Sequence, residues 1–468
     1  MKRFSQIVAR TVACAAAATM SLTMSLWAPQ AMGQSIEDAL AKAYLNNPTL
    51  LSTRAGLRST DEAVPQALAN WRPSVEVTSS IGAEVVNNNT STTGTGLNQS
   101  RRPKDIGLSV TQPLFRGGRT LAATSGAENE IRAARARLLE TEQGILLQAA
   151  TSYLNVFRDQ AVLELNRNNE EVLQRQLEAT RDRFEVGEIT RTDVHQAEAR
   201  LARSKADRIQ SEGDLETSRA NYLNIVGEPA PDTLILPGAL LDLPTSADDA
   251  VRTAIVNNPA VIAAEFDRRQ SMDNVDEVWG ELLPELDLTA SSTREVQTTT
   301  ENSLRTSHEI SLNLTVPIYQ QGEVYSRLRE ARQDAAQSTL VIDTKRRDAA
   351  EAATQSYESL TTTQAQVDAF QTQIEASVVA LEGVQREAAV GSRTVLDILN
   401  AEQELLDSRV SHVRSQRDEF VAAYELMSAI GRLTAKDLGL TVDLYDPREH
   451  YDEVRGKWFG GDSSGGVK

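Results

Sequence analysis

The sequence predicts an α+β chain built from a duplicated unit, in which two pairs of β-strands alternate with two long helical hairpins. Three observations predict this fold: ordered internal repeats, long proline-free stretches with seven-residue apolar spacing, and short segments of alternating polarity. The chain has 468 residues, enough for two or three ordinary domains or for one long unit of repeats. We therefore expect two similar halves after an N-terminal targeting segment.

The first 33 residues have the features of a secretory signal peptide. Lys2, Arg3 and Arg10 give a positively charged start, and an apolar stretch follows over 11–27. Small residues at 31–33 (Ala-Met-Gly) then offer a cleavage site. An N-terminal membrane anchor is the alternative, but the apolar stretch is short for a membrane span.

Composition narrows the class of the mature chain. The only cysteine, Cys14, lies in the signal, so we expect no disulfide and no thiolate metal site. The net charge of the full chain is −18, and loss of the basic signal makes it more negative. Such a chain repels nucleic acid and draws cations into any enclosed space. No later segment has 18 uninterrupted apolar residues, so no transmembrane helix is expected.

The chain repeats itself. Residues 39–48 (ALAKAYLNNP) return as 250–259 (AVRTAIVNNP), and further matches follow in the same order. We assign residues 34–246 to the first repeat and 247–468 to the second. The ordered matches are Pro73 with Pro284, Pro113 with Pro317, Tyr153 with Tyr357, Gly187 with Gly391, Asp193 with Asp397, and Gly227 with Gly431.

Each repeat is expected to contain a helical hairpin, over about 118–227 and 322–431. These spans lack proline and are rich in helix-forming residues. Leu399, Leu406 and Val413 are seven apart, the spacing that keeps an apolar seam against a partner helix. Gly187 and Gly391 each interrupt a hairpin where the chain reverses. The proline-rich stretch 228–246 reads as a connector and 432–468 as a tail.

Segments of alternating polarity predict four β-strands, at about 74–87, 104–113, 285–296 and 307–317. In the first of them, Val75 and Val77 alternate with Glu76 and Thr78. A polar loop joins each pair of strands, as on the outer side of a membrane barrel. Four strands per chain argue against a simple coiled-coil rod.

Aromatic residues bracket the other ends of the predicted strands. Trp71 and Trp279 precede the first strand of each pair, while Phe115 and Tyr319 follow the second. Aromatic residues gather at the interface between lipid and water, so we expect these four to lie at one membrane interface. Each alone is equally consistent with an ordinary packing contact.

Four strands cannot close a barrel, and lipid does not tolerate an open sheet edge. The chain must therefore oligomerise. A dimer would supply eight strands with a filled interior, and a trimer twelve strands with room for a pore. Strand counting leaves both possibilities open.

Together these elements resemble the TolC family over nearly all of the mature chain. The specific motifs are the two Asn-Asn-Pro breaks at 46–48 and 257–259, the strand end TQPLFRGG at 111–118, and the paired tips at 186–194 and 390–399. The resemblance implies a homotrimer with a twelve-stranded barrel in outer-membrane lipid. It also implies a twelve-helix periplasmic tunnel, and a mixed collar containing 228–246 and the tail.

The same resemblance implies a gate at the inner end of the tunnel. By motif, Arg393 takes the position of an arginine that bonds to the neighbouring hairpin, at Thr192 and Asp193. Asp397 takes the first acidic ring position. Asn400 stands where the family often has a second aspartate. The tips at Gly187 and Gly391 are the expected docking points of a periplasmic adaptor.

The expected function is a passive duct for an efflux pump or a type I secretion system. It would join an inner-membrane pump or ABC transporter, through an adaptor, to the exterior. The alternative is a periplasmic coiled-coil scaffold or adaptor, which has no need of the four strands. His195, His308, His412 and His450 have no metal-ligand spacing, and no phosphate loop or nucleophile motif occurs. We therefore expect no catalytic residue, metal or cofactor.

Overall fold

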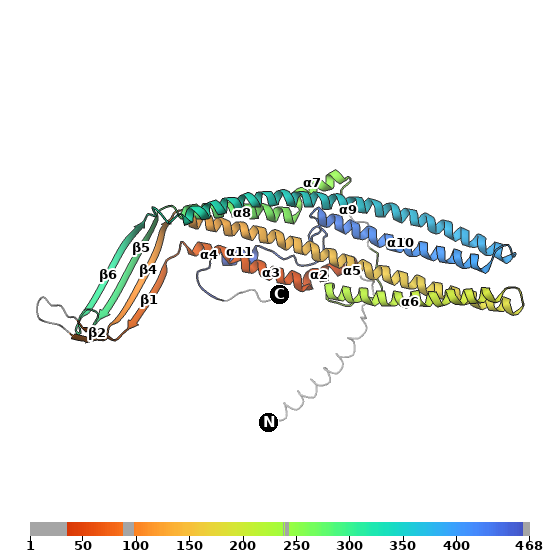
Figure 1. Ribbon diagram of the computed structural model, residues 1–468, viewed down its shortest axis with the longest axis horizontal. Helices are drawn as coiled ribbons and strands as arrows, with labels where there is room; N and C mark the ends of the chain where they lie inside the picture. The colour runs from red at the N-terminus through yellow and green to blue at the C-terminus, as the bar shows by residue number, and fades with distance from the viewer. Residues whose placement is uncertain (1–34, 88–97, 237, 239–242, 462–468) are drawn as a thin grey trace, which may run out of the picture.

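The computed structural model describes residues 35–87, 98–236, 238 and 243–461 of an elongated molecule (Figure 1). The expected signal peptide lies outside the described residues, as do parts of the first strand loop, the connector and the end of the tail. A β-sheet forms one end of the molecule. Two long helical hairpins run from the sheet to the other end, and shorter helices flank them. The α+β fold predicted from the sequence is confirmed.

The order of elements in the second half follows that of the first, except that α8 stands in place of α3 and α4, the β2–β3 hairpin has no counterpart among the described residues, and α11 is additional. The first half contains α2 (Ile36–Asn46), α3 (Pro48–Asp61), α4 (Ala63–Ala69), β1 (Ser74–Ile81), β2 (Glu84–Asn87), β3 (Asn98–Arg101), β4 (Lys104–Arg116), α5 (Arg119–Glu185) and α6 (Arg191–Val226). The second contains α7 (Ala247–Asn257), α8 (Pro259–Gly280), β5 (Glu285–Val296), β6 (Leu304–Thr315), α9 (Glu323–Ala389), α10 (Val395–Ala429) and α11 (Glu449–Val454).

The two Asn-Asn-Pro motifs make equivalent joints. Asn47 caps α3 by accepting the backbone N–H two residues on, and its amide nitrogen donates to the carbonyl of Ile225 at 3.0 Å. Asn258 caps α8 in the same way and donates to the carbonyl of Ala429 at 3.2 Å. Proline follows each cap at the first helical position, where its missing N–H costs nothing. Each motif thus ties a short helix to the end of a hairpin.

The long helices α5 and α9 each have 67 residues, which corresponds to about 100 Å. They pack against α6 and α10 as antiparallel pairs. Among the described residues, none of the helices combines the length and the apolar character needed to cross a bilayer. The largest buried cluster lies beside the middle of α5, where α2, α3, the ends of α6 and α10 and residues 433–440 meet.

The seam between α5 and α6 alternates leucine with serine. Leu201 and Leu215 are buried, and so are Ser204, Ser211 and Ser218, which are seven residues apart. Ser211 accepts a hydrogen bond from the Asn166 amide of α5 at 2.6 Å. Small polar residues let the two helices approach closely. Hydrogen bonds therefore hold part of the hairpin together, where large apolar side chains would otherwise pack.

The strands form one four-stranded antiparallel sheet in the order β1-β4-β5-β6, and β2 and β3 form a separate hairpin beyond it. The register brings Val75, Val110, Ala290 and Ile310 into one row across all four strands. Residues directly opposite each other point to the same face of a sheet. This face is therefore apolar on every strand in this row, and it stays mainly apolar toward the helices, whereas toward the strand loops it also carries Ser292, His308 and Arg294.

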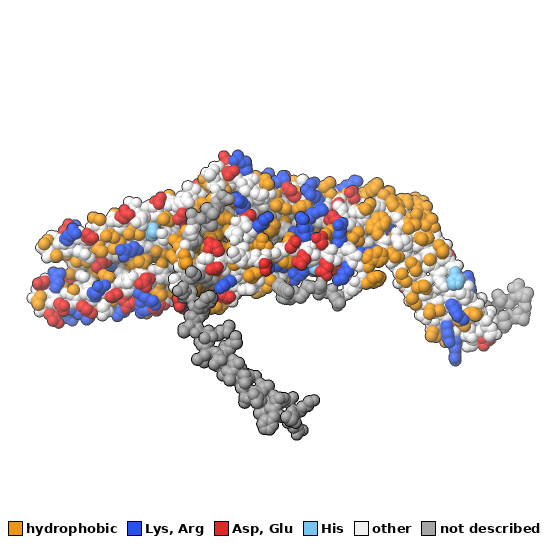
Figure 2. Space-filling model, turned by 180° about the vertical axis from the view of Figure 1, so that it is seen from behind, with side chains coloured by type: hydrophobic (Ala, Val, Ile, Leu, Met, Phe, Trp, Pro, Cys, Tyr) orange, Lys and Arg blue, Asp and Glu red, His pale blue; other side chains and the backbone are white. Residues whose placement is uncertain are grey.

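The next row across the sheet is polar and points to the opposite face. It consists of Glu76, Ser109, Ser291 and Glu309. The apolar face is not covered by the rest of the chain, since Ile310 is 79% exposed. Figure 2 shows apolar side chains gathered over the sheet and its junction with the helices, whereas charges are spread over the hairpins.

The prediction that Phe115 follows its strand is wrong. β4 continues to Arg116, and a change of register between Pro113 and Phe115 keeps the strand paired with β5. Phe115 lies opposite Leu286, so it joins the apolar face near the end of the sheet. The first predicted strand also divides into β1 and β2, and β6 begins at Leu304, before the expected 307.

In the part of the chain that the structure describes, β1 and β6 each have a strand neighbour on one side only. Both outer edges of the sheet thus carry backbone N–H and C=O groups that need partners. Lipid supplies none, because an unpaired peptide group in hydrocarbon costs several kcal/mol, about as much as several ordinary hydrogen bonds contribute.

From the barrel that the resemblance implies, we predict that Leu312→Lys reduces the amount of chain assembled in the membrane. Leu312 is 61% exposed on the apolar face, and a lysine on the lipid face costs about 2–4 kcal/mol at the bilayer midplane and less toward the interfaces. Asn313→Lys is the matched control, because the neighbouring residue points to the polar face. The amount of heat-sensitive oligomer in outer-membrane fractions measures the effect. Equal losses in both variants would contradict the assignment of the two faces.

Candidate functional site

The candidate site is the pair of hairpin tips, which lie together at the end of the molecule remote from the sheet (Figure 1). Gly187 and Gly391 sit at the two turns with φ of +82° and +77°. A Cβ placed on either glycine would meet nothing within 4 Å. Glycine is therefore required for the left-handed backbone and not for close packing.

The turns themselves are of one kind. In the first, the N–H groups of Gly187 and Glu188 donate to the carbonyls of Phe184 and Arg183, at 3.0 and 2.9 Å. The second tip repeats both bonds at 3.1 and 3.0 Å. This is the Schellman arrangement, which satisfies the last carbonyls of a helix.

A threonine and an aspartate then begin each returning helix. The Asp193 carboxylate accepts hydrogen bonds from the backbone N–H and hydroxyl of Thr190, at 2.9 and 2.7 Å. Asp397 does the same with Thr394, at 2.9 and 2.8 Å. Each threonine in turn caps the aspartate's backbone N–H. These capping boxes explain why both aspartates stand six residues after a tip glycine.

The capping bonds also set the charge of Asp397. Hydrogen bonds from Thr394, and then the nearby Arg393 guanidinium, hold the pKa of the Asp397 carboxyl below its usual value. Asp397 is thus a carboxylate at neutral pH.

The other predicted gate residues have partners of their own within the chain. The Arg393 Nε donates to Glu387 of its own hairpin at 2.8 Å, so its contact with Thr192 or Asp193 stays a prediction. Asn400 accepts a hydrogen bond from Arg200 at 2.8 Å. Arg200 lies on α6 and Asn400 on α10, so this bond joins the two hairpins. The sequence carried no signal for Arg200.

An apolar cluster joins the hairpins above the tips. Val395 and Leu399 of α10 pack with Leu173, Leu177, Ala197 and Leu201 of the first hairpin. Glu402, on the next turn of α10, is only 9% exposed. Burial raises the pKa of its carboxyl, and its Oε2 has no hydrogen-bond partner among the described residues. The seam therefore contains one poorly satisfied polar group.

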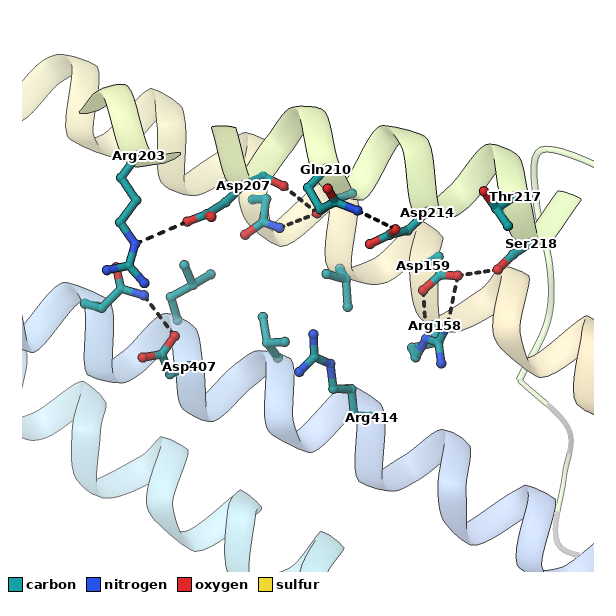
Figure 3. A pocket seen from close by; sticks show the side chains of 16 residues that line it. Arg158, Asp159, Arg203, Asp207, Gln210, Asp214, Thr217, Ser218, Asp407 and Arg414 are labelled. Atoms are coloured by element: carbon teal, nitrogen blue, oxygen red, sulfur yellow. Dashed lines mark hydrogen bonds and ion pairs between the residues drawn. The ribbon is translucent and has the colours of Figure 1, made fainter. Parts of the chain in front are cut away.

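A cleft of about 610 Å³ separates the hairpins farther from the tips (Figure 3). α5 and α6 form one wall and α10 the other. Many of the charges in it are paired within one wall, such as Arg203 with Asp207. Its charged residues are Arg158, Asp159, Arg203, Asp207, Asp214, Asp407 and Arg414.

The four predicted interface aromatics lie where the sheet meets the helices. Trp279 is in the last turn of α8, and its side chain is about half exposed, as is that of Phe115. Tyr319 is 75% exposed, and the Trp71 carbonyl accepts a hydrogen bond from the Gln112 amide of β4 at 2.8 Å. Within the described residues, no group of three His, Cys, Asp or Glu side chains could hold a metal ion.

Comparison with known proteins gives consistent matches along the chain. The family model for outer membrane efflux proteins matches residues 39–228 and 250–432. The outer membrane efflux protein BepC of Brucella suis is 34% identical, over 95% of this chain and 96% of its own. The outer membrane protein TolC of Escherichia coli is 22% identical, over 90% of this chain and 86% of its own.

Solved structures share the fold. The CmeC outer membrane channel of Campylobacter jejuni matches with a TM-score of 0.77 and 15% identity, over 90% of this chain and 89% of its own. The outer membrane protein VceC of Vibrio cholerae matches with a TM-score of 0.74 and 18% identity, over 85% of this chain and 96% of its own.

We predict that Thr394→Ala loosens the first turn of α10. Loss of a threonine cap costs about 0.5–2 kcal/mol, which raises amide exchange in that turn by roughly 2- to 30-fold. Hydrogen–deuterium exchange of the intact protein measures this. Thr362→Ala, at an exposed position inside α9, is the control and should leave exchange at the tip unchanged. Unchanged exchange in Thr394→Ala would show that the cap is not needed.

Proposed function

The chain belongs to the family of outer membrane efflux proteins, and from this premise we propose that three copies of it form one export duct. The resemblance to the TolC family predicted from the sequence is confirmed. The chain is an outer-membrane channel for efflux or type I secretion. The family consists of transport ducts and not of enzymes.

The main support for the trimer comes from the faces and the edges of the sheet. Its register gives a mainly apolar face on the part of the sheet nearer the helices, and its two edges lack partners in the described chain. Three copies supply twelve strands, which enclose a lumen, whereas the eight strands of a dimer would be filled by their own side chains. The polar face, with Glu76 and Glu309, then lines the water-filled interior. A periplasmic scaffold leaves this division of faces without a purpose.

The proposed partners are a periplasmic adaptor and an inner-membrane pump or ABC transporter. Among the relatives, PrtF of Dickeya chrysanthemi is a protease secretion protein and OpmQ of Pseudomonas aeruginosa is named for pyoverdine export. We place the adaptor at the tips and along the charged cleft between the hairpins, because mixed charges of both signs suit a polar helix. The signal peptide at 1–33 is proposed to direct export and to be removed.

The mass of the detergent-solubilised protein tests the proposal. Native mass spectrometry of the purified full chain should give three times the mass of one chain, and heating should release monomer. A mass of one or two chains under conditions that keep the protein in its membrane-extracted fold would reject the trimeric duct.

The gate is the second part of the proposal. Three copies of Asp397 around one axis would form a negative ring that attracts cations. Arg393 would exchange its partner Glu387 for the Thr192–Asp193 region of a neighbouring hairpin in the closed duct. Asn400, bonded to Arg200, leaves the ring with one carboxylate per chain.

We predict that Gly391→Val reduces export while leaving trimer and membrane insertion intact. Valine disfavours the left-handed turn by about 1–2 kcal/mol, so the tip that meets the adaptor is distorted. Gly391→Asn is the matched control, since asparagine tolerates positive φ. Secretion or drug efflux by cells carrying each variant measures the effect, and Gly187→Val should behave like Gly391→Val. Normal export by both valine variants would remove the tips from adaptor docking.

We predict that Asp397→Asn lowers the cation selectivity of the channel and its block by multivalent cations. Asparagine keeps an oxygen that can accept the Thr394 capping bonds and removes only the charge. Reversal potentials in planar bilayers measure selectivity. Asp193→Asn is the control, because it makes the same change in the other tip. An equal loss in both variants would mean that tip charge in general, and not a ring at 397, governs selectivity.

We predict that Arg393→Ser raises the mean conductance of the channel in bilayers. Serine cannot hold a neighbouring hairpin by an ion pair, so the closed state loses three links at once. Arg386→Ser is the matched control, since Arg386 pairs with Glu382 on the same helix. An unchanged conductance in Arg393→Ser would move the closure elsewhere along the tunnel.

A further inference from the structure

The C-terminal segment 440–459, here called the C-terminal strap, is fastened along the N-terminal helices. At its beginning, the Tyr445 N–H donates to the Tyr44 hydroxyl at 3.0 Å. The Arg54 guanidinium lies over both rings, 4.3 Å from that of Tyr44 and 5.1 Å from that of Tyr445. The first fastening therefore joins the strap to α2 and α3.

A second fastening lies farther along α3. The His450 ring nitrogen is 3.2 Å from the carboxylate of Asp61, which is fully buried at the end of that helix. The next residue, Tyr451, lies under the guanidinium of Arg135 at 5.1 Å and that of Arg455 at 5.8 Å. The strap thus follows α3 toward the sheet, fixed by cation–π contacts and an acid–imidazole pair.

The strap ends beside the first strand. The Arg72 side chain donates to the Lys457 carbonyl at 2.8 Å, and its guanidinium lies 4.9 Å from the Trp458 ring. Arg72 is two residues before β1 and directly follows Trp71. About two residues of extended chain, or roughly 7 Å, separate it from the start of the sheet. The end of the strap is therefore at the level where the apolar face begins.

Two large aromatic side chains stand exposed at this level. Trp458 is 58% exposed and Phe459 is 87% exposed. They are beside two cationic residues, Arg72 and Lys457. Tryptophan and phenylalanine with lysine and arginine are the residues that occupy the boundary between phospholipid headgroups and acyl chains. The same boundary is where the four interface aromatics of the strands are expected.

We propose that Trp458 and Phe459 insert into the phospholipid leaflet on the periplasmic side of the outer membrane, as an anchor supplied by the C-terminus. The inference rests on the proposed function, because it requires the sheet to span that membrane. Phospholipid is favoured as the occupant by continuity with the apolar face of β1 and by the basic residues Arg72 and Lys457 beside the two rings. The strap then ties the helices around the middle of the tunnel to the membrane surface.

The chain allows this contact to be read by fluorescence. Beyond residue 33 its tryptophans are Trp71, Trp279 and Trp458. Combining Trp71→Phe with Trp279→Phe leaves Trp458 alone, and combining Trp71→Phe with Trp458→Phe leaves Trp279 alone. A third variant replaces all three by phenylalanine and carries Phe184→Trp at the tip of the first hairpin, which is the control remote from lipid.

Each full-length variant is reconstituted in phosphatidylcholine vesicles with and without bromine at acyl carbons 6 and 7. Bromine quenches only tryptophans that touch the lipid. We expect bromine to quench Trp458 to the same extent as Trp279, because both would lie at the interface, and the tip signal to stay unchanged. Quenching of Trp279 without quenching of Trp458 overturns the anchor and leaves the duct intact. If bromine quenches neither Trp458 nor Trp279, the membrane-spanning sheet itself is rejected.

A crosslinking experiment keeps the test valid if the tryptophan variants fail to assemble. Benzoylphenylalanine is incorporated at position 459 of the otherwise unchanged chain, and the oligomer is irradiated in the same vesicles. A mass increase of one phospholipid supports the anchor. A crosslink to a second copy of the chain overturns it, because the aromatic pair would then be covered by protein.

Discussion

The backbone groups along the outer edges of β1 and β6 are the constraint on which the molecule depends. Neither edge has a partner in the described chain, and hydrocarbon offers none. In the proposed trimer, copies of the chain therefore pair edge to edge. That pairing is productive only if the apolar rows of neighbouring copies continue one another, which the common register of the four strands allows. The helices attached to each strand pair are then carried into a ring as well.

The sheet could be predicted from sequence because lipid and water impose opposite demands on alternate residues. Val75 and Val77 alternate with polar neighbours for that reason, and the duplicated helices follow from their proline-free, seven-residue spacing. The position of Phe115 could not be predicted. It depends on a register change after Pro113, and such a change is decided by pairing with β5, which is about 170 residues away along the chain.

At the tips, too, some features could be predicted from the sequence and others could not. The Thr-x-x-Asp pattern in each tip was visible in the sequence, and a capping box accounts for Asp193 and Asp397 without any gate. The gate interpretation depends on the family resemblance and on the equivalent positions of Asp193 and Asp397 in the two tips. The capping boxes explain these equivalent positions. Arg200 with Asn400 and the contacts of the strap join residues far apart in the chain. A local sequence pattern does not predict contacts between residues so far apart in the chain.

Apolar packing between the hairpins decreases from the cluster around Tyr153 toward the tips. Around Tyr153 and Leu146 a large apolar cluster draws on both halves of the chain, so separating the hairpins there would expose much apolar surface. Toward the tips the hairpins meet through the small cluster around Leu399, one hydrogen bond at Arg200 and the buried carboxyl of Glu402, whose Oε2 has no partner among the described residues. A buried polar group without a partner weakens the seam that contains it. Within one chain, separating the hairpins at the tips therefore exposes less apolar surface than separating them at the cluster around Tyr153.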